Sequence, residues 1–352
     1  MTIDNIHGPA KAALDSLAKG QVAFLQSLPK AELHAHLNGS IPISTLEELA
    51  REYIASSGSK FSSGDMLETI ENFKAGVKLE KIADFFSLFP VIYTLTSNPD
   101  ALRRATRAVL NRFLDGDEPQ CTYLELRTGP RKTDKMSREE YIRAVLDEVE
   151  RYDEDRAGLI ITLDRPTGPD NWKEILDIAL KLKREGRRVL GVDLAGDPLK
   201  ADVEDFRAFF AQAKEASLGV TLHIAETPDN SSEETLKLLS YQPDRLGHAT
   251  FLDEKAIKIV TEENTPIEIC LSSNLLCKTA TDLETHHIRQ YLRCDHPVAI
   301  CTDDTLPFRT NLLAEYALLL AAPPLGLGLS EDEVRKVAEM SMNSRLKVLL
   351  KQ

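Results

Sequence analysis

The stretch Leu33-His34-Ala35-His36-Leu37-Asn38-Gly39-Ser40 decides how the rest of this chain is interpreted. Two histidines two positions apart, flanked by apolar residues and followed by Asn-Gly-Ser, are typical of a strand that ends in a loop. Side chains two positions apart on a strand point to the same side, so both imidazoles can reach one point. Neutral imidazole is a common ligand of zinc and similar metals. A His-x-His pair is weak evidence by itself, because a hydrogen-bonded pair of histidines in a core or on a surface gives the same pattern.

The composition is that of a globular protein. The chain has 352 residues, of which 42% are hydrophobic and 28% charged, and its mean hydropathy is -0.24. The length allows two domains, but α/β barrels often use such a length as one. A formal net charge of -13 argues against nonspecific binding to nucleic acid or to an anionic membrane.

The cysteines and the termini favour a cytosolic location. The five cysteines form no C-x-x-C pair and their number is odd, which predicts reduced thiols. Residues 1–23 lack the apolar core of a signal peptide, and no apolar run approaches the ~20 residues of a membrane span. The sequence does not define the oligomeric state, and a monomer is compatible with it.

Short apolar strands alternate with amphipathic helices over most of the chain. The first predicted helix, residues 10–28, ends before Pro29. Residues 66–114 are mostly helical, and Phe86 and Phe89 fall on the apolar stripe that predicts a core-facing side. The predicted strands are 31–37, 122–126, 158–163, 188–194, 220–225, 245–249, 267–271 and 298–302. Further helices are predicted at 44–52, 138–151, 172–184, 203–216, 233–240, 253–263, 310–320 and 330–350.

Eight strands, nearly all followed by a helix, predict parallel pairing through crossover connections. This number favours a (β/α)₈ TIM barrel of the metal-dependent hydrolase type with additional helices over an open doubly wound sheet. No Gly-x-Gly-x-x-Gly follows the first strand, which removes the main sign of a dinucleotide-binding sheet. We therefore expect one catalytic domain over 1–352, with a helical extension at 1–28 and packing helices at about 305–352.

Polar residues gather where the predicted strands end. Active-site groups of such barrels lie at the carboxyl ends of the strands. The residues at or after these ends are His34, His36, Glu125–Thr128, Asp164, Arg165, Asp193–Pro198, His223, Glu226, His248, Ser272–Asn274, Asp303 and Asp304. Each has an ordinary alternative: His223 fits a core histidine, and Asp303-Asp304 fits a helix cap. Their convergence on eight strand ends nevertheless favours a metal-dependent enzyme.

The chemistry that fits is hydrolysis by a metal-activated water. Three imidazoles and one carboxylate, from His34, His36, His223 and Asp303, leave a position for water, whose pKa the cation lowers toward neutrality. Nearby groups then have separate roles. Glu226 can protonate the substrate and His248 can hold or deprotonate the attacking water, whereas Asp304 is expected to point toward the substrate.

Five ordered motifs resemble those of the adenosine deaminase family of metal-dependent hydrolases. They are Pro29–Leu37, Gly196-Asp197-Pro198, His223-Ile224-Ala225-Glu226, Leu246-Gly247-His248 and Cys301-Thr302-Asp303-Asp304. The resemblance implies a zinc-bearing barrel, with one Zn²⁺ per chain, that replaces the purine 6-amino group by oxygen. It also implies that the four metal ligands are those given above, with Glu226 as the proton donor to purine N1. His248 then acts on the water, Asp304 bonds to N7, and the Gly196 N–H contacts N3.

Within this family the chain is similar to the adenosine deaminase-like branch, whose members are N6-methyl-AMP deaminases that yield IMP and methylamine. Asn38 stands where adenosine and adenine deaminases usually have an acidic residue, which lowers repulsion against a phosphate. Arg127 and Thr128 are then expected to hold that phosphate by charge-assisted hydrogen bonds, although an internal ion pair of Arg127 is the alternative. The resemblance also implies that Asp164 and Gly196 line the nucleotide site.

Two features of the site stay open in the sequence. Tyr93 stands where the pattern of this branch has a histidine, which leaves its role undefined, and the helices of residues 66–97 are expected to shape the pocket for the N6 substituent. The metal is also undefined by the motifs, because a His₃Asp set accepts iron, cobalt or manganese as well as zinc.

Other functions compete with the deamination of N6-methyl-AMP. Plain adenosine deamination, giving inosine and ammonia, is the close alternative, and adenine deamination is a weaker one. A catalytically inactive protein that binds purine or metal is disfavoured, because such a protein has no need of Glu226 and His248. A nucleic-acid deaminase conflicts with the net charge of -13. We therefore expect a free small-molecule purine nucleotide as the substrate, with no nucleic-acid partner.

Overall fold

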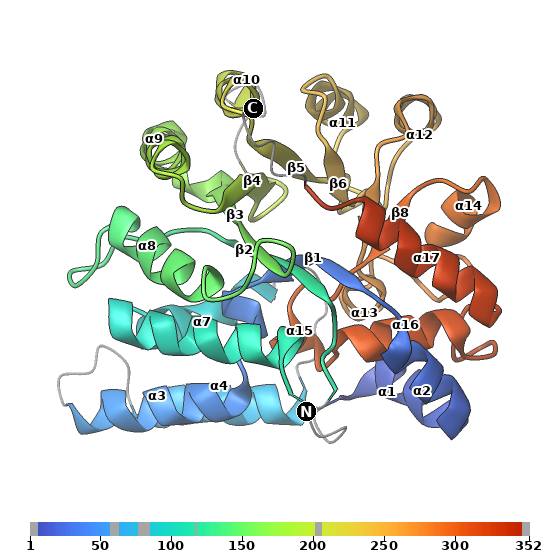
Figure 1. The fold of residues 1–352 in the computed structure, drawn as a ribbon, viewed down its shortest axis with the longest axis horizontal. Coiled ribbons are helices and arrows are strands. Elements are labelled where there is room, and N and C mark those ends of the chain that lie inside the picture. The colour runs from blue at the N-terminus through green and yellow to red at the C-terminus, as the bar shows by residue number, and fades with distance from the viewer. Residues whose placement is uncertain (1–5, 57–62, 77–84, 117, 201–205, 347–352) are drawn as a thin grey trace.

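The computed structural model contains a parallel barrel of eight strands in the order β1 to β8 (Figure 1). It describes residues 6–56, 63–76, 85–116, 118–200 and 206–346. The strands are β1 Ala31–His36, β2 Tyr123–Thr128, β3 Ala157–Asp164, β4 Val189–Ala195, β5 Gly219–Ile224, β6 Arg245–His248, β7 Ile267–Ile269 and β8 Val298–Ile300. The first and last strands meet through a parallel bridge between Ala35 and Asp303, where the His36 N–H donates to the Asp303 carbonyl at 3.1 Å. The predicted (β/α)₈ barrel is therefore confirmed.

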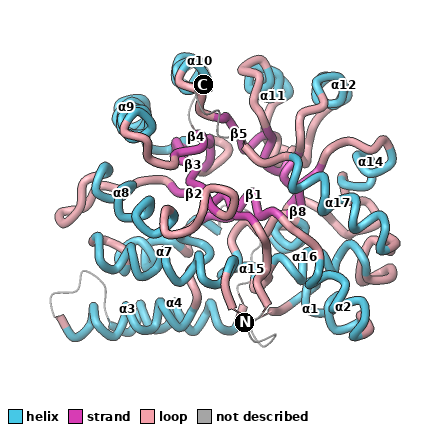
Figure 2. The backbone as a smooth tube through the Cα atoms, viewed as in Figure 1, coloured by secondary structure: helices cyan, strands magenta, loops and turns pink. Residues whose placement is uncertain are grey.

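Helices surround the strands (Figure 2). Those that follow β2 to β6 include α8 Arg138–Val149, α9 Pro169–Arg184, α10 Arg207–Glu215, α11 Ser232–Leu239 and α12 Glu254–Glu263. The others are α1 Gly8–Ser16, α2 Lys19–Ser27, α3 Ile43–Ala55, α4 Ser63–Ala75, α6 Phe89–Leu95, α7 Pro99–Leu114, α13 Leu271–Leu276, α14 Ile288–Arg293, α15 Thr305–Phe308, α16 Leu312–Leu320 and α17 Glu331–Asn343. Among the described residues, no helix has both the length and the apolar character needed to cross a bilayer.

Local sequence explains where several helices begin. The Ser137 side chain accepts a hydrogen bond from the Glu140 N–H, and the Glu140 side chain accepts one from the Ser137 N–H. This capping box satisfies two backbone N–H groups that have no partner within α8. Ser330 and Glu333 form the same capping box at the start of α17. The apolar faces of these helices then pack on the strands, which are buried along almost their whole length.

Three predicted elements differ from the structure. The helix predicted over 10–28 is broken between α1 and α2, where Leu17 and Ala18 have extended backbone. The strand predicted over 267–271 stops at Ile269, and Leu271 begins the short helix α13 instead. The helix predicted over 330–350 ends at Asn343, and the last part of that prediction, 347–350, lies outside the described residues. A continuous apolar pattern does not mark such ends, since it contains no Gly or Pro there.

The C-terminal segment fills the barrel at the amino ends of the strands. The side chain of Leu346 packs with Ile160 and Leu190, and a methyl group added at Gly219 would lie 2.5 Å from it. A methyl group at Gly191 would lie equally close to the backbone oxygen of Gly219. The glycines on β4 and β5 therefore leave the space that this leucine occupies. At this end the Leu346 side chain occupies the barrel interior, and the polar strand ends face a pocket at the opposite end.

Candidate metal centre and purine pocket

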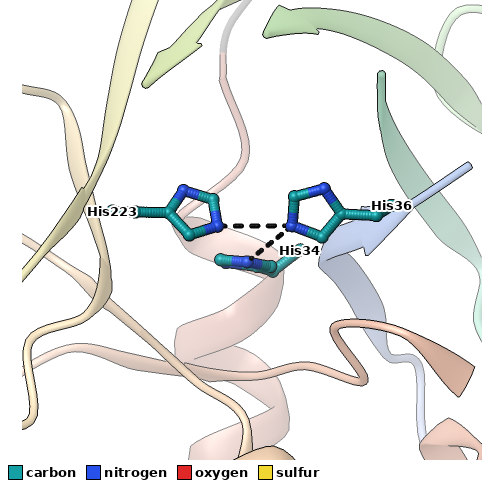
Figure 3. Close-up of side chains that lie close together, drawn as sticks. All are labelled: His34, His36 and His223. Atoms are coloured by element: carbon teal, nitrogen blue, oxygen red, sulfur yellow. Dashed lines mark hydrogen bonds between the residues drawn. The ribbon is translucent and has the colours of Figure 1, made fainter. Parts of the chain in front are cut away.

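The predicted metal ligands converge on one point at the carboxyl ends of the strands. His34 and His36 lie on β1, His223 lies on β5, and Asp303 follows β8. The Nε2 atom of His36 lies 3.3 Å from the Nε2 atoms of both His34 and His223 (Figure 3). The Oδ1 atom of Asp303 lies 3.4 Å from Nε2 of His36 and 3.7 Å from Nε2 of His34. Donor atoms about 2.1 Å from a zinc ion lie roughly 3.0–3.6 Å apart in a five-coordinate arrangement, which keeps one position for water, so these spacings fit such an ion.

The opposite ring nitrogens of two of these histidines are held by buried carboxylates. Glu268 Oε2 lies 2.6 Å from Nδ1 of His34, and Asp193 Oδ1 lies 3.1 Å from Nδ1 of His223. A carboxylate on Nδ1 fixes the tautomer in which Nε2 is an unprotonated donor atom, as metal-binding histidines require. Burial also lowers the pKa of His36 to about 3, which keeps that ring neutral. The donor set is thus ready for a divalent cation.

Two further predicted residues lie beside this cluster. His248 ends β6, and its Nε2 atom lies 3.7 Å from Oε1 of Glu226, which follows β5. The ring of His248 also stands close to those of His34 and His223, with centroids 4.9 and 5.2 Å away. The predicted base and the predicted acid therefore lie close to each other, and His248 lies beside the histidine cluster.

The strand ends that carry these groups have an unusual backbone. Ala225, His248 and Asp303 all have positive φ angles, of 46°, 62° and 60°. Residues other than glycine adopt this left-handed region at a cost of roughly 1–3 kcal/mol, and they concentrate at functional sites. In each case the left-handed residue lies at or just after the end of a strand.

Asp304 is buried beside Asp303, and the pKa values of the two carboxyl groups are shifted in opposite directions. Burial and the negative charge of Asp303 raise the pKa of Asp304 well above its usual value, whereas nearby histidines hold the pKa of Asp303 low despite burial. This shift favours the protonated form of Asp304, which can donate a hydrogen bond. A methyl group at Gly39 would overlap the Asp304 carboxyl group, so the glycine of the opening stretch makes room for it.

A pocket of about 410 Å³ opens over these groups. Its volume lies within the ~300–1,000 Å³ typical of small-molecule sites. One wall is aromatic and consists of Phe85, Phe86, Phe89 and Tyr93, at α6 and just before it. The prediction that the phenylalanine stripe is core was incomplete: Phe89 is 7% exposed and belongs to the core cluster, yet it and Phe86 also line the pocket. The described part of this helical region therefore lines the pocket, whereas its contact with the N6 substituent stays a prediction.

Asp164, Gly196 and Thr128 line the same pocket, as predicted. Gly196 has a φ of 94°, and a methyl group there would overlap the Asp164 carboxylate. Burial raises the pKa of Asp164 to about 6. Thr128 shares a hydrogen bond of 2.8 Å with the Tyr141 hydroxyl, to which Asn38 Nδ2 also donates at 3.2 Å. These contacts fix Thr128 and Asn38 at the rim of the pocket.

Arg127 is not placed as the phosphate prediction requires. Its side chain is fully buried, forms an ion pair of 2.8 Å with Glu268, and donates to the Leu33 carbonyl at 2.5 Å. A second, longer ion pair of 3.4 Å joins it to Asp193. The alternative of an internal ion pair is therefore the one the structure has, and the proposed contact of Arg127 with a phosphate is withdrawn. Alternation on β2 places this residue toward the barrel interior.

Arg131 is a second cation that lines the pocket, and its role was not predicted from the sequence. Its guanidinium lies 3.5 Å above the Tyr93 ring and donates to Asn38 Oδ1 at 3.0 Å. The side chain is only partly buried and lines the pocket together with the metal-binding histidines. A cation just beyond the end of a barrel strand falls at the pocket rim. The stretch Thr128-Gly129-Pro130-Arg131 therefore contained a signal for the place of Arg131.

A larger hollow, of about 820 Å³, lies at the opposite end of the barrel, where β3, β4 and β5 begin. It contains none of the metal-site residues. Two of its cations have partners: Arg187 pairs with Glu150 at 2.8 Å, and Arg188 donates to the Tyr152 carbonyl at 2.6 Å. Size alone therefore does not identify the functional pocket.

Several known proteins are similar to this chain in sequence and fold. The adenosine deaminase family model matches residues 29–346. The adenosine deaminase-like protein of Drosophila melanogaster is 35% identical over 86% of this chain and 88% of its own, and the human N6-methyl-AMP deaminase is 34% identical over 84% and 83%. A crystal structure of Arabidopsis ADAL complexed with IMP superposes with a TM-score of 0.82 at 32% identity, covering 92% of this chain and 94% of that one. The chain belongs to the adenosine deaminase family.

Proposed function

We propose that this protein is a zinc-dependent hydrolytic deaminase that converts N6-methyl-AMP and related N6-substituted AMP into IMP, with release of methylamine or the corresponding amine. The carrying observation is that Arg131 and the histidine cluster line one pocket, so a single ligand can meet a cation at one end and the metal position at the other. The human relative is an N6-methyl-AMP deaminase, and the Arabidopsis ADAL structure contains IMP. Both support the same substrate class.

His34, His36, His223 and Asp303 would hold one Zn²⁺ per chain, because their donor atoms match the spacing that such an ion requires. When bound, the ion supplies a water of lowered pKa next to purine C6. His248 lies beside this position and is suited to orient the attacking water and to accept its proton.

The remaining groups act on the purine ring. Glu226 donates a proton to N1, which makes C6 more electrophilic. The protonated Asp304 donates a hydrogen bond to N7, and the Gly196 N–H approaches N3, where a side chain would block the base. The water oxygen bonds to C6 while one water proton passes to His248. The amine nitrogen then takes that proton as the C6–N bond breaks, so neutral amine leaves, and the remaining hydroxyl proton returns to Glu226 as C6 becomes a carbonyl.

The phosphate is proposed to lie between Arg131, Asn38 and Thr128, whose side chains meet at the pocket rim. A guanidinium paired with a neutral amide keeps its charge available for a dianionic group. Asp164, which lies beside Gly196, is suited to accept hydrogen bonds from ribose hydroxyls. The net charge of -13 supports a free nucleotide rather than nucleic acid as the substrate.

Purified protein tested with N6-methyl-AMP, AMP, N6-methyladenosine and adenosine decides between nucleotide and nucleoside chemistry. We expect the highest kcat/KM for N6-methyl-AMP, with metal analysis giving one zinc per chain. Fast turnover of adenosine with inert nucleotides would favour plain adenosine deamination. Metal or purine binding without any turnover would mark an inactive binding protein.

The organisation and location of the protein are part of the proposal. The helices α1 and α2 pack on α16, and α17 packs on β1 and β8, which supports one catalytic domain over 1–352. We also propose a cytosolic location, for which the odd number of cysteines outside any C-x-x-C pair is the support. Size-exclusion chromatography with light scattering tests whether the protein is a monomer.

A further inference from the structure

The guanidinium of Arg127 lies directly beneath the metal-binding histidines. It contacts Glu268 at 2.8 Å through Nη2 and Asp193 at 3.4 Å through Nη1. These three side chains are fully buried, so the single positive charge of Arg127 offsets part of the negative charge of the two carboxylates without help from water. The Leu33 carbonyl accepts a further hydrogen bond from Nη2, which ties the guanidinium to the backbone next to His34.

The two carboxylates that Arg127 contacts are those that orient two different metal-binding rings. Glu268 lies 2.6 Å from Nδ1 of His34, on β1, and Asp193 lies 3.1 Å from Nδ1 of His223, on β5. One planar cation therefore connects carboxylate–histidine pairs from opposite parts of the barrel. A group of this kind sets the relative orientation of two ligands that share no backbone connection.

We propose that Arg127 is a positioning residue that tunes metal affinity by fixing Glu268 and Asp193, and through them His34 and His223. This inference rests on the proposed metal site, but it is independent of which purine the enzyme deaminates. It also explains why an arginine lies on the buried side of the pocket, where a phosphate would have to displace two ion pairs.

Neighbouring contacts explain why Arg127 has a role distinct from other buried groups. Glu268 Oε1 is held separately, by Arg245 at 2.7 Å and by the Thr221 hydroxyl at 3.0 Å. Those contacts fix only the end of the carboxylate that faces away from His34. Arg127 contacts Oε2, the same oxygen that accepts from the ring of His34. Loss of Arg127 therefore leaves Glu268 anchored but free to tilt.

The test compares metal affinity in three variants. Arg127→Met removes the charge, Arg127→Lys keeps a charge but cannot reach both carboxylates, and Arg131→Met removes the cation at the pocket rim as the control. Metal-free protein is titrated with Zn²⁺ in competition with a chromophoric chelator, and Co²⁺ is added to record the visible ligand-field spectrum. Removal of an outer-shell partner typically weakens metal affinity ~10–100-fold.

We expect Arg127→Met to weaken Zn²⁺ affinity by about this factor and to shift the Co²⁺ bands, and Arg127→Lys to lie between it and the unmodified protein. Arg131→Met should change neither, but should raise the KM for the nucleotide. Unchanged affinity and spectrum in folded Arg127 variants overturn the inference, and a rise in KM alone would restore the phosphate role. If Arg127→Met does not accumulate as folded protein, the lysine variant decides. Absence of metal binding in the unmodified protein would instead overturn the proposed function.

Discussion

The Asn38 side-chain carbonyl accepts a hydrogen bond from the Arg131 guanidinium at 3.0 Å. A neutral amide positions the guanidinium without neutralising it, and Arg131 also stacks on Tyr93 at 3.5 Å. The residue that the sequence linked to the phosphate through reduced repulsion thus has a second, direct effect. It leaves a full positive charge at the rim of the pocket.

Asn38→Asp should impair nucleotide binding selectively. The new carboxylate would form a close ion pair with Arg131 and would repel a phosphate. Loss of a charge-assisted contact, about 1.5–3 kcal/mol, predicts roughly a 10- to 100-fold fall in kcat/KM for N6-methyl-AMP, mainly through KM. The fall should be much smaller for N6-methyladenosine, which lacks the phosphate. Equal losses for both substrates would contradict the assignment.

Glu226→Gln should remove most activity while leaving the metal site intact. Glutamine has the same shape but cannot supply a proton to N1, and loss of a general acid typically costs ~10²–10⁴-fold in rate. Bound zinc, measured by elemental analysis, should stay at the level of the unmodified protein because Glu226 is not among the four proposed ligands. Retention of full activity would show that the acid assignment is wrong.

His287→Phe should lower kcat through the backbone of His248. His287 Nε2 donates to the His248 carbonyl at 3.0 Å, and this bond supports a residue whose φ is 62°. Phenylalanine keeps a ring at this position but removes the donor, so the His248 turn is freer to relax. Because small displacements of reacting groups cost up to ~10²-fold, we expect about a tenfold fall in kcat with KM and zinc content little changed. An unaltered kcat would argue against this role.

Glu315→Gln should change how stability depends on pH. Burial raises the pKa of Glu315 to about 7, and its carboxyl group accepts from the Ser272 N–H at 3.0 Å and the Thr310 hydroxyl at 2.6 Å. A raised folded-state pKa for an acid favours the protonated form, so this contribution to stability is present below about pH 4.5 and is lost as pH rises through about 7.

Glutamine at position 315 has no such titration. The variant should therefore gain stability relative to the unmodified protein between pH 5 and pH 8, by about 2–3 kcal/mol. Urea unfolding of both metal-free proteins at the two pH values measures this difference, because effects of other groups cancel. A difference that does not depend on pH would show that Glu315 titrates normally.

Much of the fold was predictable because its signals are local. Each barrel strand is short, apolar and followed by an amphipathic helix, and the polar group at its end marks the pocket. The same logic brought the proposed metal ligands together, since His34 and His36 share one face of β1 while His223 and Asp303 lie at or after the ends of other strands. Residue type and place along a strand were sufficient there.

The predictions for individual side chains were wrong or incomplete where their place depends on the three-dimensional arrangement of the strands. Arg127 and Arg131 are both cations near the end of β2, and only the barrel curvature places the first beneath the pocket and the second at its rim. The contact of Glu268 with His34 was not predictable from the sequence. Glu268 lies in the middle of β7, and His34 lies 234 positions earlier in the chain. The positive φ of His248 has no signature in its residue type.

The plug formed by Leu346 and the bridge between Ala35 and Asp303 have a consequence for synthesis of the protein. The first strand of the barrel emerges from the ribosome early, but its closing partner and the leucine that fills the lower end of the barrel come last. Until Asp303 has been made, β1 lacks this closing partner, and an unpaired strand edge favours aggregation. Assembly of the metal centre, which joins residues from both ends of the chain, is necessarily one of the last events of folding.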